Sequence, residues 1–457
     1  MGSLHRAAIL ALLSTLIATQ GCASKPYLHW HGGDLFGTTE AGGTAPSRVD
    51  CPGTTEQRFA CFAGRVRERV ASQSGALAVA TADGALLHVT TTEPGQSVAT
   101  SPDTVFPLAS VSKMFTAATA VSLARAGLLE LERPLASYLR EVGANTELGR
   151  VTLHQLLTHT AGLVDDPRRP LCSGGGALPQ AVARAHIGAA PGAVHLYSNI
   201  GYSLVGIVIE RVTSKTFEEV VRERVLLPMK MTRATFDFGS LEVRGHPTGA
   251  GEGSRCRLTA PAGGLHTSSR ELALWARAMS EPATHPLGPS LVETLTTPYV
   301  ETGARTGEAY GYGVLMSTRA GVRVYHHGGS VEDFSAFVAW VPARKLGAAA
   351  MVNTSQGFPA GAVLRGLSLL LDLPDDWRAN AEGSPRPLSA YVGTYVDRKS
   401  WLGRVRVRLE RDELAFDYPD GPPPLLPPWF TFRFVAGEPR ARFVVTAAGV
   451  AERVSDP

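Results

Sequence analysis

Two side chains with the chemistry of an activated nucleophile stand three positions apart, at Ser110 and Lys113. In a helix this spacing places both on one face, where the lysine amine can reach the serine oxygen. A serine hydroxyl is a poor nucleophile at neutral pH, and a desolvated lysine beside it can act as the base or orient the base that takes its proton. Taken alone, Ser110 is also compatible with a helix N-cap, so the interpretation depends on the rest of the chain.

Two further motifs follow in the chain, Tyr197-Ser198-Asn199 and His327-Gly328-Gly329. Alone, the first of these is typical of a polar turn that opens the next helix. With the Ser-x-x-Lys pair in front of them, the motifs predict a nucleophilic serine hydrolase. In such an enzyme Ser110 attacks a carbonyl carbon and forms an acyl-enzyme that water then hydrolyses.

The surroundings of these motifs resemble one known family. The stretch Phe106–Ala117 is similar to the nucleophile region of the β-lactamase and penicillin-binding-protein superfamily, which includes class C β-lactamases, D-alanyl-D-alanine carboxypeptidases and family VIII esterases. The resemblance runs from about residue 57 to about residue 372. It also rests on the segments Val151–Leu163, Pro191-Gly192, Leu227–Thr232, Ala262–Ser268 and Tyr310–Gly313.

The resemblance implies a role for each motif residue. Tyr197 is the expected proton carrier, because a phenol close to a lysine ammonium titrates below its usual value of about 10 and a phenolate is a competent base. Asn199 is expected to orient the lysine and the substrate amide. The backbone N–H groups of Ser110 and Ser330 are the expected oxyanion hole. His327, Gly328 and Gly329 are expected to bind substrate, with the glycines permitting its close approach to the strand.

The substrate is left open among an ester, a D-amino-acid peptide and a β-lactam, because one scaffold carries all three activities. The best-known β-lactamases carry lysine where this chain has His327. A histidine is mostly neutral at pH 7 and grips a substrate carboxylate less firmly than lysine does, so we expect an esterase, carboxypeptidase or D-aminopeptidase with little β-lactamase activity. His326 fits the same pattern, and the two following glycines favour His327. A Ser-Asp-Asn triplet is missing, which argues against the class A mechanism.

Hydrophobic patterns predict the elements that must position these residues. Short apolar runs predict strands at 76–80, 85–90, 322–327 and 336–341, and apolar spacing predicts helices at 110–126 and 200–213. The expected fold class is α/β (α+β): a central antiparallel sheet flanked by helices, an all-helical subdomain, and a small C-terminal all-β domain. The active site is expected in the cleft between sheet and helices.

The N-terminus has the pattern of an export signal. A basic start and an apolar stretch at 7–17 predict a signal peptide over residues 1–21, too short to span a membrane. Gly21-Cys22 resembles a lipoprotein cleavage site, which predicts lipidation of Cys22 and attachment to a membrane; ordinary signal-peptidase cleavage nearby is the alternative. The predicted location is the periplasm or cell envelope. Residues 22–56, rich in glycine, threonine and proline, predict a flexible tether.

Five cysteines are consistent with export to an oxidising compartment. If Cys22 carries lipid, the other four allow three pairings. Cys51 with Cys61 is the expected short-range pair, which leaves Cys172 with Cys256. Free buried thiols are the alternative for the second pair.

Composition narrows the function further. The chain has 457 residues, 44% of them hydrophobic, and a net charge of only +3, so a soluble globular enzyme is expected and nucleic acid is not. A serine hydrolase domain at 57–375 and a β-rich domain at 386–457 fit this length. The histidines and cysteines lack the spacing of metal ligands, so no metal or cofactor is expected. A small-molecule or peptidoglycan-like substrate is the expected partner, and the oligomeric state stays open.

A second class of function uses the same fold. The chain could be a catalytically weak cell-envelope binding or sensor module built on an inactivated hydrolase. The joint presence of Ser110, Lys113 and Tyr197 argues against this alternative, and covalent labelling by a fluorophosphonate would discriminate the two.

Overall fold

The structure is a computed structural model, and it describes part of the chain. The signal segment, Cys22, Cys172, Cys256 and the predicted domain boundary between residues 375 and 386 lie outside the described residues. These are 28–30, 51–69, 72–96, 98–164, 177–241, 243, 258–302, 307–319, 321–331, 333–354, 362–363, 366–367, 370–371, 389, 392–396, 404–410, 413–417, 433–435, 443–446 and 449–455.

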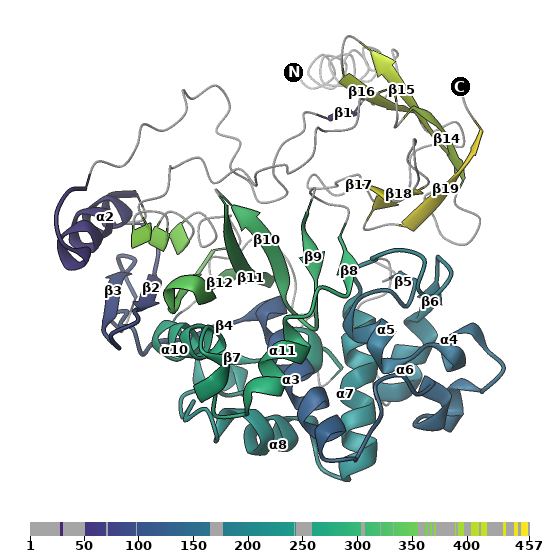
Figure 1. The fold of residues 1–457 in the computed structure, drawn as a ribbon, viewed down its shortest axis with the longest axis horizontal. Coiled ribbons are helices and arrows are strands. Elements are labelled where there is room, and N and C mark those ends of the chain that lie inside the picture. Colours follow the sequence, from purple (N-terminus) through teal and green to yellow (C-terminus); the bar gives the residue numbers. More distant parts are fainter. Residues whose placement is uncertain are drawn as a thin grey trace, which may run out of the picture.

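A central antiparallel sheet organises residues 75–352 (Figure 1). Its described strands follow the order β3-β2-β13-β12-β11-β10-β9-β8. The first and last strands of this sheet in the sequence, β2 and β13, are neighbours in space because they pair directly; β13 was not predicted from the sequence. In sheet order the strands are β3 (Leu86–Thr91), β2 (Gly75–Ala80), β13 (Leu346–Val352), β12 (Phe334–Val341), β11 (Val322–Val331), β10 (Leu315–Arg319), β9 (Ala309–Tyr310) and β8 (Val300–Glu301).

Both faces of the sheet are covered, which explains why its inner strands are apolar without interruption. Every residue of β12 and β13 is buried. Alternate residues of β12 belong to two separate cores: Val338 and Trp340 lie in the larger one, and Phe337 and Ala339 in the smaller one. This is the pattern expected where side chains alternate between two buried faces.

Helices supply both covers. Helix α10 packs on β13 and β2 and contributes Trp275 to the larger core, whereas α2 packs near β3 and contributes Phe59 and Phe62 to the smaller one. No described helix is long and apolar enough to cross a membrane. The described helices are α2 (Thr55–Arg69), α3 (Ser112–Arg125), α4 (Glu147–Arg150), α5 (Leu153–Leu157), α6 (Ala177–Arg184), α7 (Asn199–Thr213), α8 (Phe217–Val221), α9 (Ala260–Gly263), α10 (Ser269–Met279) and α11 (Pro289–Leu295).

The predicted helical subdomain lies beside the sheet and comprises α4 to α8 (Figure 1). Capping boxes begin two of its helices: Thr152 pairs with Gln155 at α5, and Thr216 pairs with Glu219 at α8. The central helix α7 packs against α3, α5 and α6. The subdomain also holds one short strand pair, β5 (Leu163–Val164) with β6 (His186–Ile187), and β4 (Val105–Pro107) pairs with β7 (His266–Ser268) outside it.

The C-terminal region forms a second antiparallel sheet, as its alternating sequence predicts. Along β15, Val405 and Val407 are buried whereas Arg404 and Arg406 are exposed, so one face of the strand packs inward. The sheet order is β1 (Leu28–Trp30), β16 (Glu413–Asp417), β15 (Arg404–Glu410), β14 (Gly393–Val396), β19 (Gly449–Ser455), β18 (Phe443–Thr446) and β17 (Arg433–Val435).

The predicted tether over residues 22–56 differs from the structure in two places. Leu28–Trp30 forms strand β1 on the edge of the C-terminal sheet, where Leu28 lies opposite Phe416 and Trp30 opposite Leu414. A three-residue run is too short for its period to reveal a strand in the sequence. Residues 51–56 pack with the region of the central sheet, because Cys51 is buried and α2 begins at Thr55.

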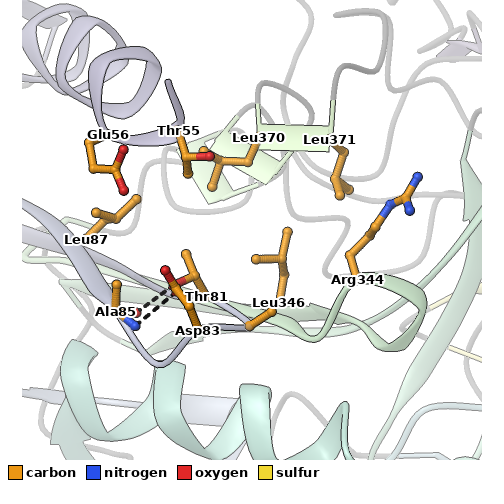
Figure 2. A pocket seen from close by; sticks show the side chains of 11 residues that line it. Thr55, Glu56, Thr81, Asp83, Ala85, Leu87, Arg344, Leu346, Leu370 and Leu371 are labelled. Atoms are coloured by element: carbon orange, nitrogen blue, oxygen red, sulfur yellow. Dashed lines mark hydrogen bonds between the residues drawn. The ribbon is translucent and has the colours of Figure 1, made fainter. Parts of the chain in front are cut away.

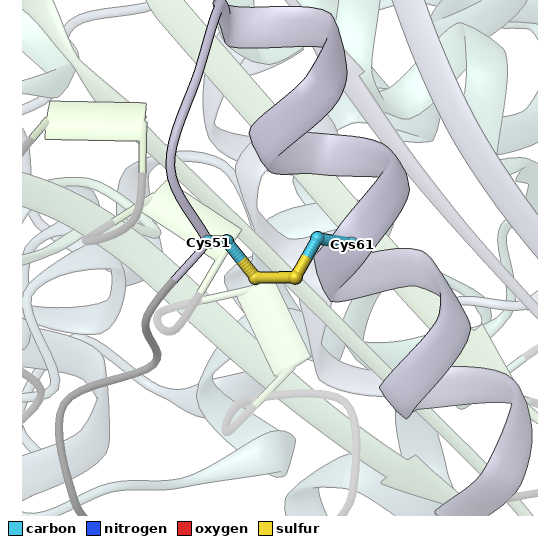
Figure 3. The surroundings of a disulfide bond; sticks show 2 residues. All are labelled: Cys51 and Cys61. Carbon is cyan, nitrogen blue, oxygen red and sulfur yellow. A yellow bond between two sulfur atoms is a disulfide. The ribbon is translucent and has the colours of Figure 1, made fainter.

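The predicted disulfide between Cys51 and Cys61 is confirmed, with the two Cα atoms 5.8 Å apart. Figure 3 shows the bond joining the segment that precedes α2 to a later turn of the same helix. Cys51 is 3% exposed and lies in the smaller core, with Phe59 and Phe62 of α2. The bond therefore fixes the segment at Cys51 to helix α2, which covers this face of the sheet.

A hollow of about 410 Å³ lies on the face of the sheet that α2 covers (Figure 2). Its floor includes Leu87 and Leu346, and Glu56 and Arg344 stand at its rim. Asp83 caps the turn between β2 and β3 there, since its carboxylate accepts hydrogen bonds from the Thr81 hydroxyl and the Ala85 N–H. The lining residues include none from the Ser-x-x-Lys, Tyr-Ser-Asn and His-Gly-Gly motifs.

We expect Gly347→Ala to destabilise the protein, because a Cβ at Gly347 on β13 would lie 2.2 Å from the backbone N of Arg277 and 2.7 Å from the carbonyl O of Ala273 in α10. Forcing atoms into such a packed contact costs about 1–3 kcal/mol or more. Urea denaturation measures the change. The control is Gly64→Ala inside α2, where a Cβ meets no atom within 4 Å and stability should rise by about 0.5–1 kcal/mol. Equal behaviour of the two variants would contradict the prediction.

Candidate active site

Ser110 lies in a tight 3-10 turn, η1 (Ala109–Val111), immediately before α3. The predicted helix over 110–126 therefore begins two residues later, at Ser112, and ends one residue earlier, at Arg125. Ala109 has φ +46°, a left-handed conformation that side chains other than glycine rarely adopt. Turn η1 packs against β11, and Ser110 stays partly exposed. Ser110 therefore lies at a sharp bend of the backbone, and the packing of η1 against β11 holds this bend.

Lys113 is wholly buried, and its amine joins three parts of the fold. The Nζ atom lies 3.1 Å from Ser110 Oγ, 2.7 Å from Asn199 Oδ1 and 2.8 Å from the carbonyl O of Ala262. The Asn199 and Ala262 oxygens can only accept, so the amine donates a hydrogen bond to each. The amine also donates a hydrogen bond to the Ser110 hydroxyl. The spacing inferred from the sequence is confirmed: the serine and lysine side chains meet.

The segment Ala262–Ser268 positions the start of α3 around that lysine. The Ser112 hydroxyl accepts a hydrogen bond from the N–H of Leu265, and the Leu265 carbonyl accepts one from the N–H of Leu108. The Thr116 hydroxyl donates to the Pro261 carbonyl one residue before the Lys113 acceptor. These bonds fix the position of α3 relative to α9, and they thereby fix the position of Lys113 Nζ.

The Tyr-Ser-Asn motif both opens a helix and enters the site. Ser198 is the N-cap of α7, where its hydroxyl accepts the N–H of Gly201. The residues on either side reach Lys113: Asn199 by its hydrogen bond, and Tyr197 with its ring centroid 4.7 Å from Nζ. Tyr197 is partly exposed. The motif therefore caps α7 and places two side chains beside Lys113.

Gly329 brings β11 against the nucleophile turn. A Cβ at this position would lie 2.2 Å from the Leu108 carbonyl O and 2.8 Å from the Ser110 backbone N. The sequence predicted that this glycine makes room for substrate, but the room is taken by protein backbone. Ser330, the next residue, is exposed on β11 opposite Ser335 of β12. The third motif thus lies directly beside Ser110.

Strand alternation decides between the two adjacent histidines. His326 faces the smaller core, where its ring stacks on Phe337 and its Nε2 lies 3.3 Å from Ser317 Oγ. His327 faces the other way and meets Tyr310, with 3.2 Å between Nε2 and the hydroxyl. His327 is therefore the histidine on the side of Ser110 and Lys113.

His327 is neutral, and both of its ring nitrogens are used within the protein. Burial, together with the positive charge of Lys113, lowers its pKa to about 3, despite an opposing hydrogen bond with Gly328. The Nδ1 atom lies 2.7 Å from the Gly328 carbonyl, which can only accept, so Nδ1 carries the proton. The Nε2 atom then accepts a hydrogen bond from the Tyr310 hydroxyl. This arrangement offers no cation to a substrate.

A buried aromatic cluster behind Tyr197 was missed by the sequence reasoning. The His159 ring lies 4.3 Å from the Tyr197 ring and 5.0 Å from that of Tyr310, measured between centroids. Burial raises the pKa of Tyr202 and Tyr310 well above the usual range, so both hydroxyls stay protonated. The available signal was that His159 and Tyr310 lie inside two of the segments that carry the family resemblance. The described residues include no group of three His, Cys, Asp or Glu side chains able to hold a metal ion.

A family model described as Beta-lactamase matches residues 62–372. The chain belongs to the β-lactamase and penicillin-binding-protein-like family of serine hydrolases. The matched span contains the three motifs, the central sheet and the helical subdomain, and it leaves the C-terminal sheet outside.

Individual relatives are distant. Penicillin-binding protein 4 of Amycolatopsis lactamdurans is 25% identical over 330 residues, which are 66% of this chain and 87% of that protein. Protein flp of Staphylococcus aureus (strain COL) is 25% identical over 281 residues, 58% of this chain, and the match spans only 55% of that protein's length. The crystal structure of SurE with D-Leu superposes with a TM-score of 0.65 at 25% identity, covering 88% of this chain and 99% of the other.

Acidification should destabilise the protein partly through His327. Its pKa is about 3 when folded, against 6.5 for an ordinary histidine, so between these values only the unfolded chain takes up the proton. The stability it contributes is present above about pH 6.5 and is lost as the pH falls toward 3, at up to about 1.4 kcal/mol per pH unit. Urea denaturation at pH 7, 5.5 and 4.5 measures this loss.

We expect His327→Gln to show a shallower loss of unfolding free energy with falling pH than the unmodified protein. The control is His88→Gln, at an exposed histidine on β3. If His327→Gln retained the full pH slope, the neutral state of His327 would be refuted.

Proposed function

We propose that the protein is an exported serine hydrolase that works through an acyl-enzyme at Ser110. The observation that carries this proposal is the 3.1 Å contact between Ser110 Oγ and a buried Lys113 amine that two other acceptors hold in place. A serine beside such an amine has a partner that can take its proton or stabilise the base that does. The family membership of the chain supports the same class of chemistry.

In the proposed reaction, Ser110 Oγ forms a bond to the substrate carbonyl carbon while its proton passes to Tyr197. Lys113 lies 4.7 Å from the Tyr197 ring centroid, and its positive charge favours the phenolate. Tyr197 then gives the proton to the leaving group as the carbonyl–leaving-group bond breaks. Water enters, Tyr197 removes its proton, and hydrolysis of the ester to Ser110 restores the enzyme.

The negative charge of the tetrahedral intermediate requires donors beside Ser110. The proposed oxyanion hole consists of the backbone N–H groups of Ser110 and Ser330, on η1 and β11. The close approach of these two elements at Gly329 supports this assignment, because it brings the two backbones within one substrate's reach. Asn199 is proposed to hold the lysine and to contact the substrate amide.

The proposed substrate is an ester or amide of a D-configured or simple acyl group that needs no carboxylate for recognition. His327 stands where the best-known β-lactamases carry lysine, and its neutral ring is hydrogen-bonded on both nitrogens within the protein. A carboxylate such as that of a penicillin would meet no charge there. The similarity to SurE, which was crystallised with D-Leu, supports a D-configured residue in the acyl part.

The first test compares an aryl ester, a penicillin and a fluorophosphonate on the same protein. We expect serine-dependent labelling by the fluorophosphonate and ester turnover, both lost in Ser110→Ala by about 1000-fold or more. The catalytic efficiency on the ester should exceed the acylation efficiency of the penicillin by about 10-fold or more. Intact mass and absorbance report both reactions.

The matched control is Ser137→Ala, at an exposed serine between α3 and α4, which should keep full activity. An unlabelled and inactive wild type would refute the hydrolase and favour the binding or sensor module. Rapid penicillin turnover would keep the hydrolase but refute the proposed selectivity.

We also propose that Cys22 carries a lipid that attaches the protein to a membrane of the cell envelope. The support is the sequence: an apolar stretch at 7–17 followed by Gly21-Cys22. In bacteria that express the full chain, an alkyne palmitate analogue should label the wild type and not Cys22→Ser. Cys172→Ser is the control that should stay labelled. Label retained by Cys22→Ser, or absent from the wild type, would favour ordinary signal-peptidase cleavage.

A further inference from the structure

We infer that His159 is a positioning residue that holds Tyr197 against Lys113. This inference rests on the proposed function, in which Tyr197 carries the proton. His159 follows α5 in the helical subdomain, well before the Tyr-Ser-Asn motif in the chain. It touches the residues on both sides of Tyr197 and the tyrosine ring itself.

Two hydrogen bonds grip the backbone that flanks Tyr197. The His159 carbonyl accepts the N–H of Leu196 at 2.7 Å, and its ring Nδ1 accepts the N–H of Ser198 at 3.1 Å. The main chain and the side chain of one residue thus bind the positions immediately before and after the tyrosine. The backbone on both sides of Tyr197 is thereby fixed.

The ring of His159 supports the ring of Tyr197 from behind. Their centroids are 4.3 Å apart with an interplanar angle of 36°. His159 is only 1% exposed, and its other ring neighbours include Tyr202 at 5.1 Å, Tyr310 at 5.0 Å and His195 at 5.6 Å. These neighbours are themselves buried, so the His159 ring is packed between them and the ring of Tyr197.

The conformation of His159 indicates that this position is imposed by its surroundings. Its φ is +58°, in the left-handed region that residues with a Cβ rarely adopt. This turn of the backbone lets its carbonyl and its ring both face the segment 196–198. Strain of this kind is retained where the surrounding structure over-determines it, and it clusters at functional sites.

The hydrogen bond from the Ser198 N–H also defines the protonation of Nδ1 in the His159 imidazole. An N–H donates to Nδ1, so Nδ1 carries no proton and acts as an acceptor. An asparagine can reproduce this acceptor through Oδ1 and tolerates the left-handed backbone, but it has no ring to support Tyr197. An alanine has neither. These differences allow the hydrogen bond to be tested apart from the bulk of the side chain.

The test measures leaving-group dependence in His159→Asn, His159→Ala and Tyr197→Phe. A tyrosine that hands its proton to the leaving group matters most when that group is a poor one. We therefore expect His159→Ala to lose about 100-fold in kcat/KM on an alkyl ester but much less on a p-nitrophenyl ester. His159→Asn should recover most of the loss, and Tyr197→Phe should show the same selective loss as His159→Ala.

The matched control is His285→Ala. His285 is also buried and also accepts a backbone N–H at Nδ1, from Leu287 at 3.2 Å, but it lies against Trp275 of α10. This variant should lose stability without changing the ratio of rates on the two esters. Thermal melting of every variant checks that the fold is retained.

Each outcome bears on one proposal. A selective loss in Tyr197→Phe without one in His159→Ala would overturn the positioning role and leave the proposed mechanism intact. Equal losses on both esters in His159→Ala, matched by His285→Ala, would reduce His159 to a stability role and overturn the inference. If Ser110→Ala kept the ester activity, the proposed function itself would fail.

Discussion

The amine of Lys113 must find its hydrogen-bond partners inside the protein, because its side chain has no access to water. A buried polar group without partners costs several kcal/mol, and a charged one costs more. The partners come from three separate parts of the chain: Ser110 before α3, Asn199 at the start of α7, and the Ala262 carbonyl in α9. The sheet region and the helical subdomain therefore meet at this nitrogen. Displacing any of these three groups would remove one hydrogen bond from the buried amine.

Close backbone contacts hold those parts at the required separation. Gly329 lets β11 lie against the nucleophile turn. Gly313 has φ +73°, and a Cβ there would lie 2.8 Å from the Lys113 carbonyl and 2.9 Å from the Met114 N. The connection between β9 and β10 thus abuts the first turn of α3 at Gly313. Gly329 sets the distance between β11 and η1, and Gly313 sets the distance between this connection and α3; larger residues would push these elements apart.

Close packing also determines the electrostatics around Lys113. Burial beside Lys113 keeps His327 neutral, and the Gly328 carbonyl and Tyr310 hydroxyl occupy its two nitrogens. The buried Tyr202 and Tyr310 remain protonated. Lys113 places a positive charge close to Ser110 and Tyr197, the residues that are proposed to react.

Local sequence determined the elements and the reactive pair. Apolar periodicity predicted strands β2, β3, β11 and β12 and the helices α3 and α7, because their side chains contact the core at regular intervals. The spacing of Ser110 and Lys113 predicted their contact, and the short separation of Cys51 and Cys61 favoured their bond. The tertiary structure alone decided three features. These are the pairing of β1 with β16, the tautomer of His327 and the hydrogen bonds of His159 to the backbone beside Tyr197. Each depends on groups that are far apart in the chain or on a backbone conformation that residue type does not specify, so no local pattern encodes it.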